Sequence, residues 1–300
     1  MAAPRVTVAV GERELTVSNL DKVLYPETGF TKAEVIDYYV RVAPTMLRHL
    51  GDRGITLRRF PNGVDESGFF EKRCPSHRPN WISTALGPGD RTGPVGYCLF
   101  TEPAALAWAA NLAAIELHAP MARAGDVEAP TMVVFDLDPG PGTAMAECAE
   151  VGLWIRDVLA GIGLECFAKT SGSKGMQVYV PLNSPHSHEH ASSFALAVAQ
   201  VLERAHPQLI VTTQAKAARK GKVLIDWSQN SRHKTTICVY SLRARPRPTV
   251  STPVRWDEVE SGADGTGLAF EAHQVLARIE ELGDLFGPTI EMVQRLPEPT

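Results

Sequence analysis

The segment TMVVFDLDPG, residues 131–140, is predicted to be an apolar strand that ends in two acids. The predicted fold class is built around this strand. Side chains two positions apart on a strand point to the same face, so Asp136 and Asp138 project together. Adjacent carboxylates repel each other unless a cation lies between them, and Mg²⁺ or Mn²⁺ prefers such oxygen ligands. The alternative is that both acids only begin the turn at Pro139.

The elements next to this segment alternate between strand and helix. Further strands are predicted for residues 165–170, 176–182 and 223–228, and helices for residues 143–160 and 190–205. This order is typical of an α/β or α+β sheet covered by helices.

The outer parts of the chain are predicted from local signals. Residues 5–18 alternate as a hairpin, and Thr31 with Glu34 has the capping-box spacing of a helix start, with a disturbance expected at Pro44. The remaining elements are a strand at 55–60, a loop region at 61–96, a helix at about 103–115 and a polar helical tail from about 255. No linker divides the chain, which predicts a single domain over 1–300.

Composition excludes several classes of protein. The 300 residues are 44% hydrophobic and 21% charged, which excludes a disordered or fibrous chain. No apolar run reaches membrane-spanning length and no signal peptide is recognisable, which predicts a cytoplasmic protein without a membrane partner. The five cysteines include no C-x-x-C pair and are therefore expected to be reduced, buried thiols.

Two more motifs could act with the paired acids. Asp226 ends the apolar run of VLIDWS, residues 223–228, and could complete a two-metal site, although the acid alone is weak evidence. The segment KTSGSKG, residues 169–175, offers small residues, hydroxyls and Lys174 to an anion. It indicates a phosphate-binding loop, with a flexible surface turn as the alternative.

Charge is distributed unevenly along the chain. The formal net charge is −4, yet residues 211–247 contain nine Lys or Arg against the single acid Asp226, a local charge of +8. Such a segment either binds phosphates or is a solvated face. The segment HSHEH, residues 186–190, lies in a loop before a predicted helix and is interpreted as surface or capping residues rather than a metal site.

Together these motifs resemble a known superfamily. FDLDPG (135–140), TSGSKG (170–175) and VLIDWSQNSRHKTTICVYSLRAR (223–245) resemble the three motifs of the archaeo-eukaryotic primase superfamily. The chain is most similar to the polymerase domains of bacterial LigD-type end-joining ligases and to their stand-alone relatives. The similarity extends from SNLDKVLYP (18–26) through RRFPNGVD, FFEK and IELHAP to about residue 285. It implies an archaeo-eukaryotic primase-like α/β (α+β) fold, a two-sheet core with covering helices.

The resemblance also implies roles for matching residues. Asp136, Asp138 and Asp226 would be catalytic and hold two divalent ions, Mn²⁺ or Mg²⁺. The residues implied to bind the nucleotide are Arg58, His118, Ser171, Ser173, Lys174, Gln229 and Arg243. Those implied to bind a DNA 5′-phosphate are Asn19, Lys22 and Lys32. Those implied to contact template or primer are Arg59, Phe69, Phe70 and Arg219.

Two local features qualify these assignments. From the residues alone, His118 is better explained as a satisfied core histidine, and a Phe pair such as Phe69-Phe70 is more often core. Gln177 stands where many ligase-linked members have histidine, and glutamine can donate a hydrogen bond but cannot titrate.

The implied activity is metal-dependent, template-directed nucleotidyl transfer at 5′-phosphorylated gaps or DNA ends, with NTPs preferred to dNTPs. No K-x-D-G ligase motif occurs, so the chain is expected to be either an excised domain or a separate polypeptide. An ATP-dependent DNA ligase, and Ku for break joining, are expected as partners of a nucleoid-associated monomer. End joining and excision-repair gap filling both stay open. Within the domain, residues 1–60 would bind the 5′-phosphate, about 97–250 would form the catalytic core, and 255–295 a helical tail.

Two other functions are weighed against this one. A haloacid-dehalogenase-like phosphohydrolase shares the D-x-D strand end, but Gly140 stands where that family has threonine. A non-catalytic DNA-end-binding module would use the basic residues without needing three acids.

Overall fold

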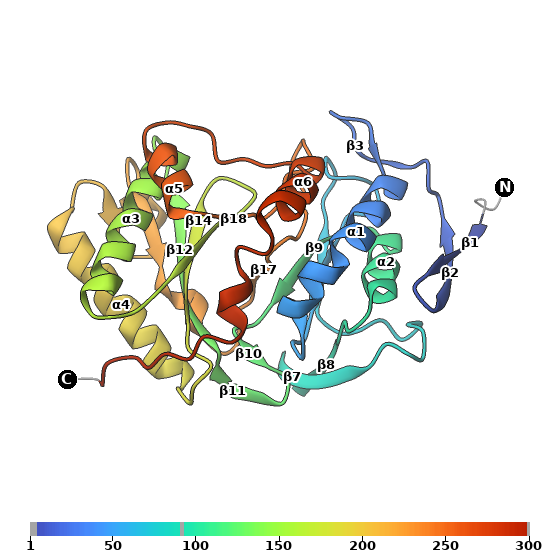
Figure 1. Cartoon of the computed structure of the whole chain (residues 1–300), viewed down its shortest axis with the longest axis horizontal. Helices are drawn as coiled ribbons and strands as arrows, with labels where there is room; N and C mark the ends of the chain where they lie inside the picture. Colours follow the sequence, from blue (N-terminus) through green and yellow to red (C-terminus); the bar gives the residue numbers. More distant parts are fainter. Residues whose placement is uncertain (1–4, 91–92, 299–300) are drawn as a thin grey trace. The chain divides into compact units, whose positions relative to one another are not determined.

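The computed structural model describes residues 5–90 and 93–298 and divides the chain into two compact units (Figure 1). Unit 1 comprises Met1–Pro120, Ile237–Val250 and Phe270–Asp284, and unit 2 comprises Met121–Thr236, Ser251–Ala269 and Leu285–Thr300. No single sequence position separates the units, because the chain returns to each of them.

Unit 1 is built on a four-stranded sheet of order β17-β9-β5-β6. Its strands are β1 (Arg5–Val10), β2 (Arg13–Ser18), β3 (Val23–Tyr25), β4 (Phe30–Thr31), β5 (Thr56–Arg59), β6 (Phe69–Glu71), β7 (Thr84–Asp90), β8 (Gly93–Cys98), β9 (Ala114–Ala119) and β17 (Thr236–Ile237). Its helices are α1 (Lys32–Leu50), α2 (Pro103–Asn111) and α6 (Ala272–Leu282). β5 pairs antiparallel with both β6 and β9.

Two helices of unit 1 differ from the prediction, one at an internal proline and the other at its C-terminal end. The capping box of Thr31 and Glu34 starts α1 as predicted, but the helix continues through Pro44 to Leu50. The Ala-rich helix α2 ends at Asn111, and residues 114–119 form β9 rather than a last helical turn. Ala113 has a positive φ of 56°, which ends the helix and turns the chain into a strand that pairs with β5.

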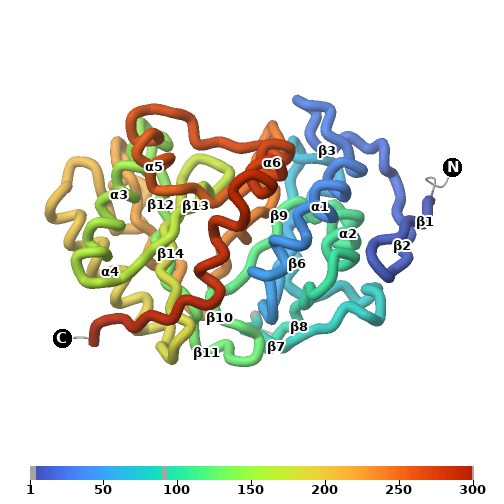
Figure 2. The backbone as a smooth tube through the Cα atoms, in the orientation of Figure 1, coloured from blue at the N-terminus to red at the C-terminus, as the bar shows by residue number. Residues whose placement is uncertain are grey.

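Unit 2 contains a six-stranded sheet of order β15-β16-β12-β14-β13-β18. Its strands are β10 (Ala122–Arg123), β11 (Asp126–Pro130), β12 (Met132–Pro139), β13 (Phe167–Thr170), β14 (Met176–Pro181), β15 (Ile210–Val211), β16 (Val223–Asp226) and β18 (Pro253–Val254). Its helices are α3 (Met145–Gly161), α4 (His188–Ala205), α5 (Trp256–Ala263) and the 3₁₀ turns η1 (Lys216–Arg219), η2 (Trp227–Asn230) and η3 (Gly287–Ile290). Within this unit α3 and α4 pack against the central strand β12 (Figures 1 and 2). The predicted mixture of sheets and covering helices is confirmed.

The expectation for the cysteines is wrong for one pair. Cys74 and Cys98 form a disulfide with their Cα atoms 4.9 Å apart, whereas Cys148, Cys166 and Cys238 are free and buried. The backbone N–H of Cys74 donates to the carbonyl of Gly96, which aligns this segment with β8. The predicted loop region 61–96 therefore contains β6, β7 and the start of β8, and no local motif signals the long-range pairing.

Other regions follow the sequence prediction. Ser187 caps α4 by accepting a hydrogen bond from the backbone N–H of His190, which confirms the capping interpretation of residues 186–190. The polar tail forms α5 and α6. Within residues 5–90 and 93–298, no helix is long and apolar enough to cross a membrane.

Candidate active site

Two of the three predicted acids of unit 2 are brought side by side by strand register. β12 pairs antiparallel with β16, and Asp136 lies directly opposite Asp226. On its other edge β12 pairs with β14, where Gln177 lies opposite Asp136. Directly opposed residues on antiparallel strands project to the same face, so Asp136 lies between a carboxylate and an amide.

The environment of Asp136 disfavours its ionised form. Burial, followed by the nearby charges of Asp138 and Asp226, raises the pKa of Asp136 to about 7, although the Gln177 amide opposes this. Gln177 Nε2 donates to Asp136 Oδ1 at 3.0 Å. The carboxylate of Asp226 accepts from Gln214 Nε2 at 2.8 Å, Ser228 Oγ at 2.6 Å and Gln229 Nε2 at 3.1 Å. These donors are all neutral, so they orient the acids without balancing their charge.

These residues fit a divalent cation by donor chemistry and by register. Carboxylate oxygens from adjacent strands are the ligands that hard cations prefer, and burial together with the charges of Asp138 and Asp226 raises the pKa of Asp136. In the part of the chain that the structure describes, however, no three Asp, Glu, His or Cys side chains are gathered around one point. Coordination by Asp136, Asp138 and Asp226 together would therefore require their side chains to turn toward a common ion.

The predicted phosphate-binding loop lies against β12. A side chain at Gly175 would place its Cβ 1.9 Å from the carbonyl oxygen of Leu137, so only glycine allows this approach. Within the loop, Ser171 Oγ accepts from the backbone N–H groups of Ser173 at 3.2 Å and Gly175 at 3.3 Å. Lys174 is exposed at the tip. The loop thus places hydroxyls and an ammonium group beside the strand that carries Asp136.

A second close approach positions Arg219. A Cβ at Gly140 would lie 1.8 Å from the carbonyl oxygen of Arg219, which holds the end of η1 against the turn after β12. The Arg219 guanidinium donates to the backbone oxygen of Gln214 at 2.8 Å and to its Oε1 at 2.9 Å. Arg219 therefore reaches Asp226 through Gln214, a residue that the sequence analysis missed.

In unit 1, three predicted nucleotide-binding residues meet at one buried acid. Arg58 Nη1 and His118 Nε2 lie 3.1 and 3.0 Å from Glu116 Oε2, and Arg243 Nε lies 3.2 Å from Glu116 Oε1. Burial alone would raise the pKa of Glu116, but the His118 hydrogen bond and the charges of Arg243 and Arg58 hold it well below its usual range. Burial lowers the pKa of His118.

Glu116 is a functional candidate that the sequence analysis missed. It is 1% exposed and stands within the apolar strand AIELHA. A charged residue inside a buried run requires partners, and this was the available signal. The arrangement also shows that His118 is held in a polar cluster rather than in an apolar core.

Of the predicted template-contacting residues, Phe69 and Phe70 lie on β6, which is the edge strand of the unit 1 sheet and is labelled in Figure 2, whereas Arg59 lies on β5 and Arg219 on η1 in unit 2. Phe69 and Phe70 are 45% and 57% exposed, so they are not core residues. Arg59 lies over the Phe69 ring at 5.3 Å, and Arg58 over the Phe70 ring at 5.2 Å. Exposed aromatic faces beside guanidinium groups suit base stacking with phosphate contact.

The three predicted 5′-phosphate residues lie together at the start of α1. The backbone N–H of Lys32 donates to the carbonyl of Lys22, whose own N–H donates to the carbonyl of Asn19. Lys32 is buried and its Nζ donates to the carbonyl of Ser18 at 2.6 Å. Burial and the neighbouring Lys22 lower the pKa of Lys32 to about 8. A helix start with two ammonium groups favours an anion.

Part of the positive charge of the strongly basic segment 211–247 is paired with acids from other parts of the chain. Its residues are divided between the two units. Arg232, Arg243 and Arg247 form ion pairs with Glu128, Glu116 and Glu271, all of which lie outside the segment. The local charge of +8 therefore overstates the positive charge offered to a ligand.

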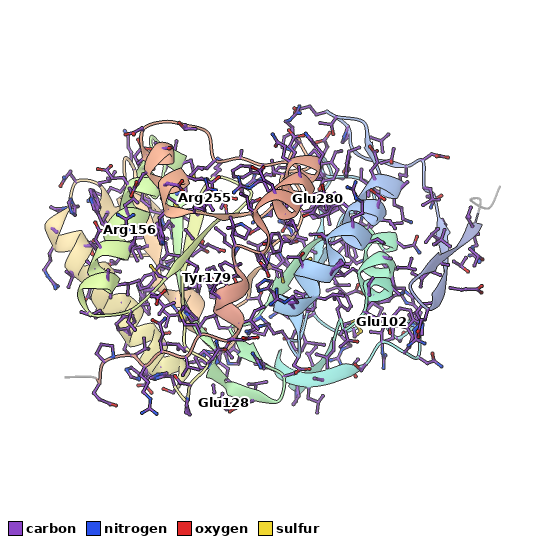
Figure 3. The ribbon with its side chains drawn as sticks, in the orientation of Figure 1. Glu102, Glu128, Arg156, Tyr179, Arg255 and Glu280 are labelled. Carbon is purple, nitrogen blue, oxygen red and sulfur yellow. A yellow bond between two sulfur atoms is a disulfide. The ribbon has the colours of Figure 1, made fainter. Side chains whose placement is uncertain are left out.

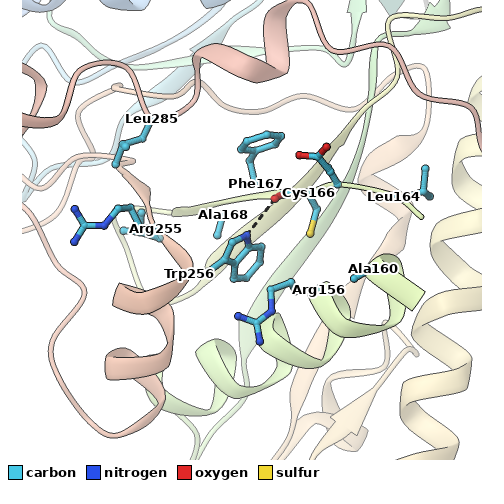
Figure 4. Close-up of a pocket in the computed structure, with 11 residues that line it drawn as sticks. Arg156, Ala160, Leu164, Cys166, Phe167, Ala168, Arg255, Trp256 and Leu285 are labelled. Atoms are coloured by element: carbon cyan, nitrogen blue, oxygen red, sulfur yellow. Dashed lines mark hydrogen bonds between the residues drawn. The ribbon is translucent and has the colours of Figure 1, made fainter. Parts of the chain in front are cut away.

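A cavity of about 450 Å³ in unit 2 is separate from these residues (Figure 4). It is lined mainly by apolar side chains such as Leu164, Phe167 and Trp256, and Trp256 Nε1 donates to the carbonyl of Cys166 at 3.2 Å. None of the predicted site residues lines it, so it is not the candidate active site.

Comparisons with known proteins point to one family. Residues 31–286 match the family model described as LigD, primase-polymerase domain. The chain is 46% identical over 285 residues to the multifunctional non-homologous end joining DNA repair protein LigD of Mycobacterium tuberculosis H37Rv, covering 92% of this chain and 37% of that protein. It is 28% identical to the bifunctional non-homologous end joining protein LigD of Bacillus subtilis, covering 90% and 43%.

A solved structure extends the comparison to the fold. The polymerase domain from Mycobacterium tuberculosis ligase D in complex with DNA matches with a TM-score of 0.87 and 44% identity, covering 93% of this chain and 99% of that one. The chain thus spans a little over a third of the M. tuberculosis protein but nearly all of the solved domain.

Proposed function

The chain belongs to the LigD primase-polymerase family, and from this premise we propose that it fills short gaps at 5′-phosphorylated DNA ends or gaps during end joining. Membership confirms the predicted superfamily resemblance, the mixed fold and the enzyme class, a template-directed nucleotidyltransferase. The phosphohydrolase alternative has no support in these comparisons.

The observation that carries the proposal is the register of β12 with its neighbours. Asp136 faces Asp226 across the strands, and Gly175 holds the loop of Ser171, Ser173 and Lys174 against β12. Carboxylates for metal and donors for phosphate are therefore adjacent within one unit. Nucleotidyl transfer requires this combination, because metal and triphosphate share oxygen ligands.

The residues of unit 2 would act by holding and orienting. Asp136, Asp138 and Asp226 would hold two divalent ions, Mn²⁺ or Mg²⁺, which lower the pKa of an attacking hydroxyl and stabilise charge at the α-phosphate. Lys174 and the hydroxyls of Ser171 and Ser173 would bind the triphosphate. Gln229 and Arg219 hold Asp226 in place, directly and through Gln214.

The residues of unit 1 would recognise sugar and DNA. His118 would contact the 2′-hydroxyl of the ribose, which would favour NTPs over dNTPs. Arg58 and Arg243, held by Glu116, would supply positive charge to the nucleotide. Arg59 with Phe69 and Phe70 would stack on and orient the template.

The DNA end would be recognised by its phosphate. Asn19, Lys22 and Lys32 would bind the 5′-phosphate at the start of α1, where the ammonium charges of Lys22 and Lys32 favour an anion. The solved relative is described in complex with DNA, which supports a nucleic-acid partner. We extend the proposal to an ATP-dependent ligase and Ku as partners, to a monomeric state and to a location at the bacterial nucleoid. A single domain over 1–300 remains part of the proposal.

The test is extension of a primer across a 5′-phosphorylated one-nucleotide gap, comparing NTP with dNTP and Mn²⁺ with Mg²⁺. We expect extension that is fastest with NTP and Mn²⁺ and is lost in Asp136→Ala and Asp226→Ala, while both variants still bind the gap. Wild-type-like extension by either variant would contradict the assignment of the acids.

The same assay separates catalysis from simple binding. A parent protein that never extends a primer, but loses its preference for 5′-phosphate in the Lys22→Ala/Lys32→Ala variant, would be a DNA-end-binding module instead.

A further inference from the structure

We propose that Lys169 is a positioning residue that fixes the orientation of the Gln177 side chain and thereby the way Asp136 presents its carboxylate to a divalent cation. The inference rests on the proposed function, because it concerns the same metal site. Lys169 lies on β13, and Gln177 lies on β14. Tyr179, which is labelled in Figure 3, also lies on β14.

Lys169 is a buried cation that donates to oxygen atoms of two neutral side chains. It is 1% exposed, and its Nζ donates to Gln177 Oε1 at 2.6 Å and to Ser251 Oγ at 2.7 Å. The Nζ also lies 5.4 Å from the centroid of the Tyr179 ring. Burying a lysine is costly, and lysines are almost never fully buried without partners. Such a residue is therefore more than a filler of the core.

The contacts of Gln177 leave its amide a single orientation. Two donors meet at Oε1, the ammonium of Lys169 and the hydroxyl of Tyr179 at 3.0 Å. A reversed amide would point its NH₂ group at the ammonium. The Nε2 group must therefore face Asp136, where it donates to Oδ1 at 3.0 Å. Lys169 thus acts on Asp136 through Gln177.

The orientation of Gln177 has a consequence for metal binding. With Oδ1 engaged by Nε2, the other oxygen of Asp136 is left to serve as the metal ligand. Groups that orient a metal ligand from behind commonly change metal affinity or activity by about 10- to 100-fold when removed.

A parallel arrangement serves Asp226. Arg219 donates to Gln214 Oε1 at 2.9 Å, and Gln214 Nε2 donates to Asp226 Oδ1 at 2.8 Å. Each of the two acids is thus linked to a basic side chain through the side chain of a glutamine. The two glutamines differ in burial, because Gln177 is 3% exposed and Gln214 lies at the surface. Solvent can replace Gln214, whereas nothing can readily replace Gln177, so we assign the larger effect to Lys169.

The experiment measures Mn²⁺ affinity by electron paramagnetic resonance of free Mn²⁺ in the full chain, without nucleotide or DNA. We expect Lys169→Met to bind Mn²⁺ at least about 10-fold more weakly. A Coulombic role alone predicts the opposite, because removing a positive charge near the site would tighten Mn²⁺ binding. Arg204→Met, which removes a charge from the exposed end of α4, is the control and should leave the affinity unchanged.

A double-mutant cycle tests whether the effect passes through Gln177. In a Gln177→Met background, Lys169→Met should change the Mn²⁺ affinity by less than about twofold, because no amide remains to orient. Equal losses from Lys169→Met in both backgrounds would overturn the proposal. Thermal unfolding shows whether each variant folds. If Lys169→Met does not fold, Tyr179→Phe serves instead, because it removes the other donor to Gln177. Tyr179→Phe should weaken Mn²⁺ binding by about twofold to fivefold when Gln177 is present, and should have no effect in the Gln177→Met background.

Asp136→Ala separates this proposal from the proposed function. If Asp136→Ala abolishes Mn²⁺ binding while Lys169→Met leaves it unchanged, the positioning role is wrong and the metal site stands. If Asp136→Ala leaves Mn²⁺ binding unchanged, both proposals are wrong.

Discussion

Glu116 in unit 1 and Asp136 in unit 2 are both carboxylates on strands of a sheet, yet the charges around them differ in sign. Glu116 is contacted by two guanidinium groups and an imidazole, and its pKa is held well below the usual range. Asp136 faces a second acid and an amide, and its pKa is raised to about 7.

The difference indicates which acid has its charge balanced within the protein and which acid is suited to bind a cation. A buried carboxylate with cations on both oxygens has its charge balanced by the protein itself. A carboxylate beside other carboxylates is stabilised only when a cation from outside arrives. Replacing each acid by its amide therefore separates a structural acid from a metal-binding one.

The largest expected effect is on activity, from Asp136→Asn. We expect gap extension to fall by about 10³-fold or more, because the amide is a poor ligand for a hard cation. The unfolding temperature at pH 8 should not fall, since the raised pKa means that the ionised acid is disfavoured in the folded state. Single-turnover extension and thermal unfolding measure the two effects, and extension within tenfold of the parent would contradict the comparison.

The opposite pattern is expected from Glu116→Gln. Removing the acid leaves Arg58 and Arg243 close together without a counter-ion, which should lower the free energy of unfolding by about 3 kcal/mol. Chemical denaturation at pH 7 measures the loss. Glu71→Gln is a matched control, because Glu71 forms a single, more exposed pair with Arg59 and should cost under about 1 kcal/mol. Equal stability of the two variants would show that Glu116 is not a structural acid.

A smaller effect is expected for the buried ammonium group of Lys32, which extends the comparison from acids to a cation. The pKa of Lys32 is lowered to about 8, so its charge is lost as the pH rises through 8. Preference for a 5′-phosphate over a 5′-hydroxyl end should then fall by about fivefold between pH 7 and pH 9. Lys32→Arg, which stays charged over this range, should show a flat profile if it folds. Fluorescence anisotropy with the two DNA ends measures the ratio, and an unchanged ratio in the parent would argue against Lys32 as a phosphate ligand.

The sequence alone predicted the parts of these sites that follow a strand period. Asp136 and Asp138 could be placed from the alternation of β12, because a period of two is visible within eight residues. The capping box of α1 was equally local. Both signals lie within one element and need no partner.

The rest depended on partners that are distant in sequence. Glu116 was missed because it directly follows the alanine-rich run predicted as a helix to about 115, whereas pairing with β5 makes residues 114–119 a strand. Gln214 contacts Asp226 from a loop, and the bond between Cys74 and Cys98 depends on the pairing of a segment with β8. Contacts of this kind join residues that are far apart in the chain, so no regular spacing in the sequence indicates them.

The division of the chain also bears on how the protein is synthesised. Unit 1 includes Phe270–Asp284, and unit 2 includes Leu285–Thr300. Neither unit can gather all its segments until residues up to about 285 have left the ribosome, so the first 120 residues emerge long before their last partners. Contiguous fragments such as 1–120 or 121–236 should consequently be poor substitutes for either unit, and splitting this protein for study calls for rejoined segments rather than a cut.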